Sequence, residues 1–331
     1  MQTVKFGNTG MDVTPICLGA MSFGDPEKWT HDWVLKEDES RSIIKHALEQ
    51  GINFFDTANI YSKGESERIL GRALKDFADR EKIVVASKVY FDIHEGPNAK
   101  GLSRKAILHE IDQTLGRLDM DYIDLYIIHR WDYNTPIEET MEALHDVVKS
   151  GKVRYIGASA MYAWQFQKAQ YIAEKNGWTK FVSMQNHYNL IYREDERDMI
   201  PFCEDQNIAL TPYSPLASGR LARDWSVQTE RSKTDQVQKS KYGSTEKQDK
   251  EVVDQLAEMA EKKGVPRAQL ALAWLLHKPQ VVSPIIGATK EKYIDDAVAA
   301  LDISLTKDEM DKLEALYVPH NVVGALPDPN K

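Results

Sequence analysis

Cysteine is scarce in this sequence and long apolar runs are missing, and both absences exclude classes of protein. Cys17 and Cys203 are the only cysteines among 331 residues, and each lies in or beside an apolar stretch. We therefore expect two buried thiols in a reducing compartment and no disulfide between them. Nowhere do about 18 apolar residues follow one another, which excludes a membrane-spanning helix. The N-terminal residues also lack the pattern of a signal or transit peptide, so the expectation is a soluble cytoplasmic protein.

A basic surface is missing too. The chain has 42 Lys and Arg against 51 Asp and Glu, which gives a formal net charge of −9, and no basic block stands out. We expect no nucleic-acid partner and no membrane partner, so an anionic ligand needs a local site. Spacings such as H-E-x-x-H or C-x-x-C do not occur among the nine His and two Cys, so we predict no metal site.

Short apolar runs rich in Val, Ile and aromatic residues are typical of buried strands, and this sequence has eight of them. Amphipathic helical patterns separate the runs. One of them begins with Thr135 as a cap and Pro136 at the first helical position, and it ends at Gly151. The middle runs recur at steps of about 26 to 40 residues, the size of one βα unit. The eight predicted strands are residues 15–21, 51–56, 82–88, 124–129, 152–159, 181–185, 208–214 and 281–289.

Eight such units without a break in composition predict one α/β domain over residues 1–331, a (β/α)8 TIM barrel of parallel strands. The competing fold is a doubly wound open sheet, but no predicted strand is followed by a G-x-G-x-x-G turn. An N-terminal β-hairpin is predicted around Asn8 to Gly10. Residues 222–250 are predicted to form a long polar loop after the seventh strand, and residues 318–331 an irregular tail.

Polar residues end seven of these runs, and the C-terminal ends of the strands carry the chemistry of such barrels. Taken singly, Asp56 can cap a turn, Lys88 can extend its ammonium to solvent, and His129 can be a hydrogen-bonded structural residue. Together with Tyr61, just beyond the second strand, they form a set with a chemical use. The seven residues are Asp56, Lys88, His129, Ser159, Gln185, Ser214 and Thr289.

This set is suited to donating a proton to a developing oxyanion. A phenol has a pKa of ~10, and a cationic Lys88 beside Tyr61 would lower that pKa. Asp56 would keep the ammonium charged, and His129 would hold a substrate oxygen by a hydrogen bond. Carbonyl reduction also needs a hydride source, so we predict a nicotinamide cofactor. Its phosphates would bind at "GATKEK", which opens a helix near Lys290 after the eighth strand.

At this point the chain resembles the aldo-keto reductase family over nearly its whole length. "GINFFDTANIYSKGESERILGRAL" is similar to the family's signature around its catalytic Asp and Tyr, "VVASKV" to its lysine strand and "DYIDLYIIHRWD" to its histidine strand. "RYIGASAM", "VSMQNHYNL", "YSPLASGRL" and "PIIGATKEKYIDDA" are similar to its cofactor-binding segments. The sequence of residues 157–199 most resembles the aryl-alcohol-dehydrogenase-like and versiconal-hemiacetal-acetate-reductase-like branch of the family.

The resemblance implies a role for each matching residue. Tyr61 would be the general acid that reduces an aldehyde or ketone, with Lys88 and Asp56 tuning it and His129 orienting the substrate. A cation at Lys290 favours a 2′-phosphate, so the implied cofactor is NADPH (NADP+) rather than NADH. The implied cofactor-binding residues are Met21, Ser159, Gln185 and Tyr213 at the nicotinamide, Ser214, Leu216, Ser218, Gly219 and Arg223 at the pyrophosphate, and Gly287, Thr289 and Lys290 at the adenosine phosphate end.

The chain departs from the family pattern at four positions, which make three departures. Ala160 follows the carboxamide-binding Ser, where the family often has Asn. Tyr293 replaces a common Gln, and Asp296 with Ala297 replaces Glu-Asn. The resemblance therefore implies one cofactor hydrogen bond fewer and a different recognition of adenine.

Two other functions are compatible with the same residues. A redox-sensing partner protein would bind the cofactor tightly and turn over little, and a metal-dependent barrel hydrolase or isomerase would reuse the strand-end residues. Aromatic residues on segments that can reach the barrel mouth predict an apolar substrate pocket, with plain packing as the alternative. These are Trp29, Trp33, Tyr90, Phe91, Trp131 and Trp225.

Overall fold

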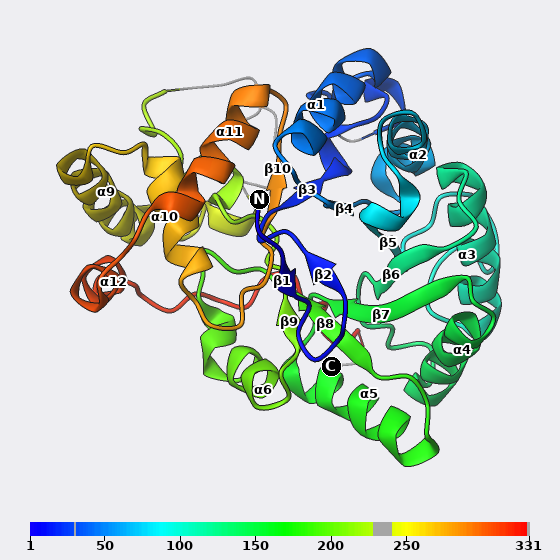
Figure 1. The fold of residues 1–331 in the computed structure, drawn as a ribbon. Coiled ribbons are helices and arrows are strands. Elements are labelled where there is room, and N and C mark those ends of the chain that lie inside the picture. The colour runs from blue at the N-terminus through cyan, green and yellow to red at the C-terminus, as the bar shows by residue number, and fades with distance from the viewer. Residues whose placement is uncertain (30, 228–239, 330–331) are drawn as a thin grey trace.

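Parallel strands form the centre of the structure, a computed structural model that describes residues 1–29, 31–227 and 240–329. Eight strands lie in the order β10-β3-β4-β5-β6-β7-β8-β9, and Figure 1 shows helices around them. The strands are buried along most of their length because helices cover one side and the barrel interior the other. Their bounds are β3 Cys17–Gly19, β4 Phe54–Asp56, β5 Val84–Val89, β6 Ile123–Ile128, β7 Val153–Ser159, β8 Phe181–Gln185, β9 Ala209–Leu210 and β10 Ile285–Gly287.

The sheet closes on itself between its two edges. The amide of Leu210 donates to the carbonyl of Gln280 at 2.9 Å, and the carbonyl of Leu210 accepts from Val282 at 2.9 Å. The predicted (β/α)8 barrel is therefore confirmed, but its first, second, seventh and eighth strands are shorter than the sequence predicted. Pro212 and Pro284 explain the shortening of the last two, because a proline has no amide hydrogen to donate to a ladder.

The N-terminal hairpin fills one end of the barrel. β1 (Val4–Lys5) and β2 (Asp12–Val13) pair in antiparallel fashion, as predicted, and Figure 1 shows them across that end. The rings of Phe6 and Phe54 meet edge to face at 5.7 Å, and Phe6 is fully buried. This end is therefore packed, which leaves the opposite end for chemistry.

Helices alternate with the strands and pack on their outer faces. α4 begins at Ile137, one residue later than the sequence predicted, because the hydroxyl of Thr135 donates to Asp132 at 2.8 Å instead of capping the helix. Across the described residues, no helix is long and apolar enough to cross a membrane. The bounds are α1 Glu37–Glu49, α2 Glu65–Phe77, α3 Arg104–Leu118, α4 Ile137–Lys149, α5 Ala163–Asn176, α6 Met199–Asp205, α9 Glu246–Lys263, α10 Arg267–Leu276, α11 Glu291–Ala299 and α12 Lys307–Glu314.

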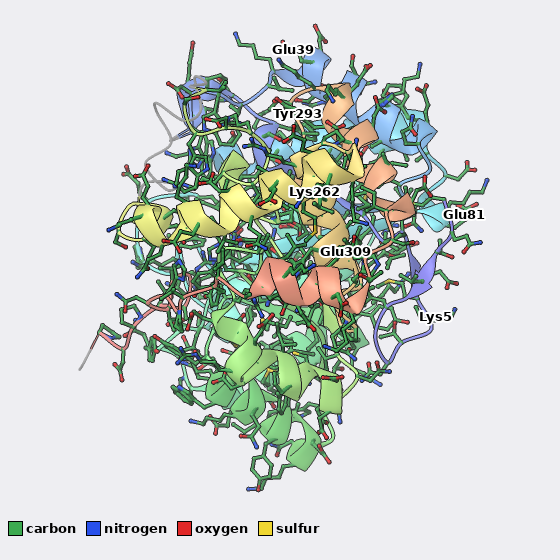
Figure 2. The ribbon with its side chains drawn as sticks, turned by 90° about the vertical axis from the view of Figure 1, so that its left-hand side faces the viewer. Lys5, Glu39, Glu81, Lys262, Tyr293 and Glu309 are labelled. Carbon is green, nitrogen blue, oxygen red and sulfur yellow. The ribbon has the colours of Figure 1, made fainter. Side chains whose placement is uncertain are left out.

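The long loop predicted over residues 222–250 is shorter at its C-terminal end, and residues 228–239 of it lie outside the described residues. α9 already begins at Glu246, because Thr245 donates to Asp249 at 2.8 Å across the first turn and the helix then buries Val252 and Leu256. Figure 2 shows α9 and α12 side by side on the outer face, where Lys263 and Glu309 form an ion pair of 2.7 Å.

Candidate active site

Four of the predicted residues meet at the end of the barrel opposite the hairpin. Asp56 ends β4 and is the register partner of Ala86 on β5. Lys88 lies two residues beyond Ala86 on that strand. The ammonium Nζ of Lys88 lies 2.5 Å from Oδ1 of Asp56, 2.8 Å from the carbonyl of Thr57 and 3.2 Å from the hydroxyl of Tyr61. Because Lys88 is wholly buried, these three acceptors take the place of water around the ammonium.

A tight turn carries Tyr61 over the barrel mouth. The turn runs over Tyr61–Gly64, and its Ser62 and Lys63 have φ of 47° and 50°, which are left-handed values that cost energy for residues other than glycine. Below it, the hydroxyl of Ser66 donates to the carbonyl of Ala20 at 2.7 Å and contacts the hydroxyl of Thr57 at 2.9 Å. These bonds hold the strained turn, and with it the phenol, in one position.

Burial and charge act in opposite directions on the pKa values of this group. Burial lowers the pKa of Lys88, but the charge of Asp56 and the contact with Tyr61 outweigh burial, so that pKa is raised. Lys88 acts to lower the pKa of Tyr61, as predicted, but desolvation of the buried phenol is the larger effect, so the net pKa of Tyr61 is raised and not lowered. Tyr61 therefore stays protonated at neutral pH, as a proton donor must.

His129 follows β6 and closes the other side of the mouth. Its ring is 6.0 Å from that of Tyr61 and 5.0 Å from that of Phe91, both edge to face. Burial and the positive charges of Arg130 and Lys88 hold the pKa of His129 well below its ordinary value. The imidazole is therefore neutral and can donate one hydrogen bond to a substrate oxygen that lies between His129 and Tyr61.

The residues predicted to bind a nicotinamide ring lie at the ends of the neighbouring strands. Ser159 ends β7, and its buried hydroxyl has no hydrogen-bond partner among the described residues. Gln185 ends β8 and donates from Nε2 to Oδ2 of Asp56 at 2.9 Å. Tyr213 stacks on His187 at 5.2 Å, and burial raises its pKa to about 12. Met21 lies in the short helical turn after β3, half-buried. An unsatisfied hydroxyl and an amide side by side fit a carboxamide.

The residues predicted to bind phosphates lie on two loops. In the first, Ser214, Ser218 and Gly219 have φ of 55°, 55° and 94°, with Leu216 between them, and such turns make concave anion sites from backbone amides. The guanidinium of Arg223 lies so close to Gly219 that a Cβ placed on Gly219 would come within 2.7 Å of it. In the second loop, Gly287 ends β10, and Thr289 and Lys290 lead into the N-terminus of α11.

Arg220 lies within the segment YSPLASGRL but was not among the residues predicted to bind the cofactor. Its Nε and Nη1 atoms are buried and have no hydrogen-bond partner among the described residues. The guanidinium lies over Trp225 at 4.4 Å, and the carbonyl of Arg220 accepts from the indole of Trp225 at 2.9 Å. Unsatisfied guanidinium donors beside the phosphate loop fit an anionic cofactor.

The positions that depart from the family pattern have structural neighbours of their own. Ala160 is buried with φ of 47°, and a Cβ on Gly324 of the C-terminal tail would lie 3.8 Å from its Cβ. On α11, Ala297 is fully buried, so its side chain cannot bind a ligand. Tyr293 is 44% exposed on the same helix, where Figure 2 shows it at the surface. Asp296 accepts from Gln269 at 2.9 Å.

The C-terminal tail lies over the barrel mouth, which the sequence did not predict. It has no regular structure up to residue 329, as expected, yet it is hydrogen-bonded to loops that follow the strands. The amide of Val323 donates to the hydroxyl of Tyr192 at 2.9 Å, and the hydroxyl of Tyr133 donates to the carbonyl of Leu326 at 3.0 Å. The tail therefore forms one wall of the mouth.

The aromatic residues proposed for the substrate pocket divide into two sets. Trp29 lies 6.2 Å from Tyr61, and Phe91 lies against His129 with Tyr90 beside it, so these rings flank the mouth. The other three pack against different partners: Trp33 on His31, Trp131 on Trp164 and Trp225 on Arg220.

Comparison with known proteins adds an independent line of observation. Residues 15–318 match the family described as the aldo/keto reductase family. The versiconal hemiacetal acetate reductase of Aspergillus parasiticus is 45% identical over 96% of this chain and 98% of that protein. A putative aryl-alcohol dehydrogenase of Saccharomyces cerevisiae is 42% identical over 96% of this chain and 98% of its own length. The aldo-keto reductase AMT2 of Alternaria alternata is 42% identical over 95% of this chain and 90% of its own.

Proposed function

This chain belongs to the aldo/keto reductase family, and we propose that it reduces aldehydes or ketones to alcohols with NADPH, with Tyr61 as the proton donor. Family membership with reductase relatives over nearly the whole length makes the chain an NAD(P)H-dependent oxidoreductase of small carbonyl compounds. The observation that carries the proposal is the 3.2 Å hydrogen bond from Lys88 to the hydroxyl of Tyr61, next to a neutral His129.

The proposed chemistry follows from these side chains. Bound NADPH would supply the hydride to the carbonyl carbon. His129 donates a hydrogen bond to the carbonyl oxygen and directs it towards the hydroxyl of Tyr61. Tyr61 then gives its proton to the oxygen as negative charge develops there. Lys88 stabilises the phenolate that remains, and Asp56 keeps Lys88 charged despite its burial.

The same proposal assigns the cofactor to the residues at the strand ends. Ser159 and Gln185 would bind the carboxamide, Tyr213 would pack on the ring, and the phosphate loops would bind the pyrophosphate, with Arg220 added to the predicted set. Lys290 is exposed at the N-terminus of α11, where a cation can pair with a 2′-phosphate. This supports NADPH over NADH.

A panel of carbonyl compounds, run with NADPH and NADH side by side, tests the proposal. The names of the relatives refer to a hemiacetal acetate and to aryl alcohols, so aromatic aldehydes belong in the panel beside aliphatic ones. We expect steady turnover with NADPH and a higher KM for NADH. Slow single turnovers with retained cofactor would favour the redox-sensing alternative instead.

Lys290→Ala tests the cofactor preference separately. The substitution should raise the KM for NADPH about tenfold, the equivalent of ~1.4 kcal/mol, and leave the KM for NADH unchanged. Lys292→Ala is the matched control, because Lys292 lies in the first turn of the helix that Lys290 precedes and pairs with Asp296 at 2.8 Å. Equal effects of Lys290→Ala on both cofactors would contradict the assignment of the 2′-phosphate.

A further inference from the structure

Two histidines and a glutamate converge away from the catalytic group. His94 lies on the loop after β5, and His109 and Glu110 lie on α3; one ligand atom from each falls within 4.8 Å of the other two. We propose that these three side chains bind a divalent transition-metal cation such as Zn²⁺. The sequence showed no such site because the two histidines are 109 − 94 = 15 residues apart, on a loop and a helix, and match no ligand spacing.

Glu110 supplies a second, independent observation. Its side chain is buried, yet Oε1 accepts no hydrogen bond from any described residue. The other oxygen, Oε2, accepts from Nδ2 of Asn59 at 3.0 Å and lies 3.6 Å from a guanidinium nitrogen of Arg117. Buried carboxylate oxygens are normally paired, so Oε1 is an acceptor that lacks its partner. One oxygen of this carboxylate lies within 4.8 Å of the histidine ligand atoms, and a cation bound by Oε1 would satisfy it while Oε2 keeps its protein contacts.

The donor set and its freedom of movement suit zinc. Two imidazole nitrogens and one carboxylate oxygen, with water at the fourth position, are a common zinc environment with bond lengths of about 2.0–2.2 Å. The ligand atoms need to approach one another by at most about 1.5 Å to reach tetrahedral contact, and both histidines are exposed and can rotate. Nδ1 of His94 contacts the carbonyl of Glu95 at 3.2 Å, which leaves Nε2 for the cation.

The site has a defined relation to the barrel mouth. Phe91, three residues before His94, packs on the ring of His129, and Asn59, the partner of Glu110, precedes the turn that carries Tyr61. A cation held by His94 and α3 would therefore tie the loop after β5 to the helix beside it. Exposed Lys100 lies on this loop. Cleavage after Lys100 by trypsin thus reports on loop attachment without any measurement of catalysis.

Titration of the metal-stripped, full-length protein with ZnCl₂ against a chromophoric chelator tests the proposal. We expect one Zn²⁺ per chain, with affinity reduced at least about tenfold in both His94→Gln and His109→Gln. His46→Gln is the matched control, because it removes a histidine of α1 that pairs with Asp295 at 2.7 Å and should bind Zn²⁺ like the parent. Zn²⁺ should also slow trypsin cleavage after Lys100 in the parent but not in His94→Gln.

The proposal is overturned if the parent binds no stoichiometric Zn²⁺, or if both variants bind it as tightly as the parent. Equal loss of affinity in His46→Gln would place the ligands elsewhere and overturn it as well. Thermal melting of each variant without metal shows whether it is folded. Glu110→Gln is a less direct probe, because Glu110 also bonds Asn59 and faces Arg117.

Discussion

Replacing Asp56 with Asn removes the negative charge that faces the buried ammonium of Lys88. In the native chain Nζ lies 2.5 Å from one carboxylate oxygen of Asp56, while Gln185 donates to the other. Loss of one partner of a buried ion pair costs about 3–5 kcal/mol, because the remaining charge stays buried without compensation. We therefore expect Asp56→Asn to lower the free energy of unfolding by about that amount at pH 7, out of a usual total of about 5–15 kcal/mol.

The same substitution should reverse how stability depends on pH. The raised pKa of Lys88 in the native chain gives stability that is fully present below the unfolded-state pKa of ~10.4 and is lost as pH rises through the folded-state value. Without Asp56, burial dominates and the pKa of Lys88 falls below 10.4, so the unfolded chain binds more protons. The free energy of unfolding of Asp56→Asn should then rise with pH, by up to ~1.4 kcal/mol per pH unit.

Denaturant unfolding followed by circular dichroism, between about pH 7 and 9.5, measures this slope. Asp124→Asn is the matched control, because Asp124 pairs with Arg80 at 2.8 Å and a guanidinium does not titrate in that range. The control should lose stability without gaining a slope relative to the parent. If Asp56→Asn showed no more slope than the control, Asp56 would not be what keeps Lys88 charged.

Three further predictions concern other buried groups. Glu67→Ala should lower the free energy of unfolding in denaturant by about 3–5 kcal/mol, because Glu67 is buried against Arg117. Glu37→Ala should lower it by less than about 1 kcal/mol, because Glu37 pairs with Arg72 in contact with solvent, and equal losses in the two variants would refute the role of burial. Since the pKa of His129 lies well below its ordinary value, kcat/KM should show no step near pH 6.5, and a step there would show an ordinary imidazole. Burial raises the pKa of both cysteine thiols, so a thiol reagent should label them at pH 8 only after unfolding, and rapid native labelling would contradict their burial.

The barrel could be predicted from the sequence because its order is set by local signals. Apolar runs mark strands buried on both faces, and the length between runs matches one helix and its turns. The ends of the helices and strands were less predictable, because side-chain contacts and prolines decide them and the apolar pattern does not. Thr135 donates to Asp132 rather than capping α4, and Pro212 and Pro284 shorten the ladders at the closing edge.

The catalytic residues of the candidate site could be predicted because polar residues mark the ends of the apolar runs. Asp56, Lys88 and His129 each terminate an apolar run, so parallel strands bring them to one edge. The net pKa of Tyr61 could not be predicted, because it depends on how completely the surrounding side chains exclude water. The tail contact at Val323 and the cluster around Glu110 involve residues with no motif, and only the folded chain brings them into contact.

Turnover of Tyr61→Phe tests the central claim most directly. A positioned general acid contributes about 10²–10⁴-fold to rate, so kcat for a good aldehyde should fall by that factor while the affinity for NADPH, followed by fluorescence, stays unchanged. Tyr171→Phe removes the hydroxyl of a tyrosine that is 63% exposed on α5, and it should turn over like the parent. A Tyr61→Phe variant that reduced the aldehyde at the parent's rate would contradict the assignment of Tyr61 as the proton donor.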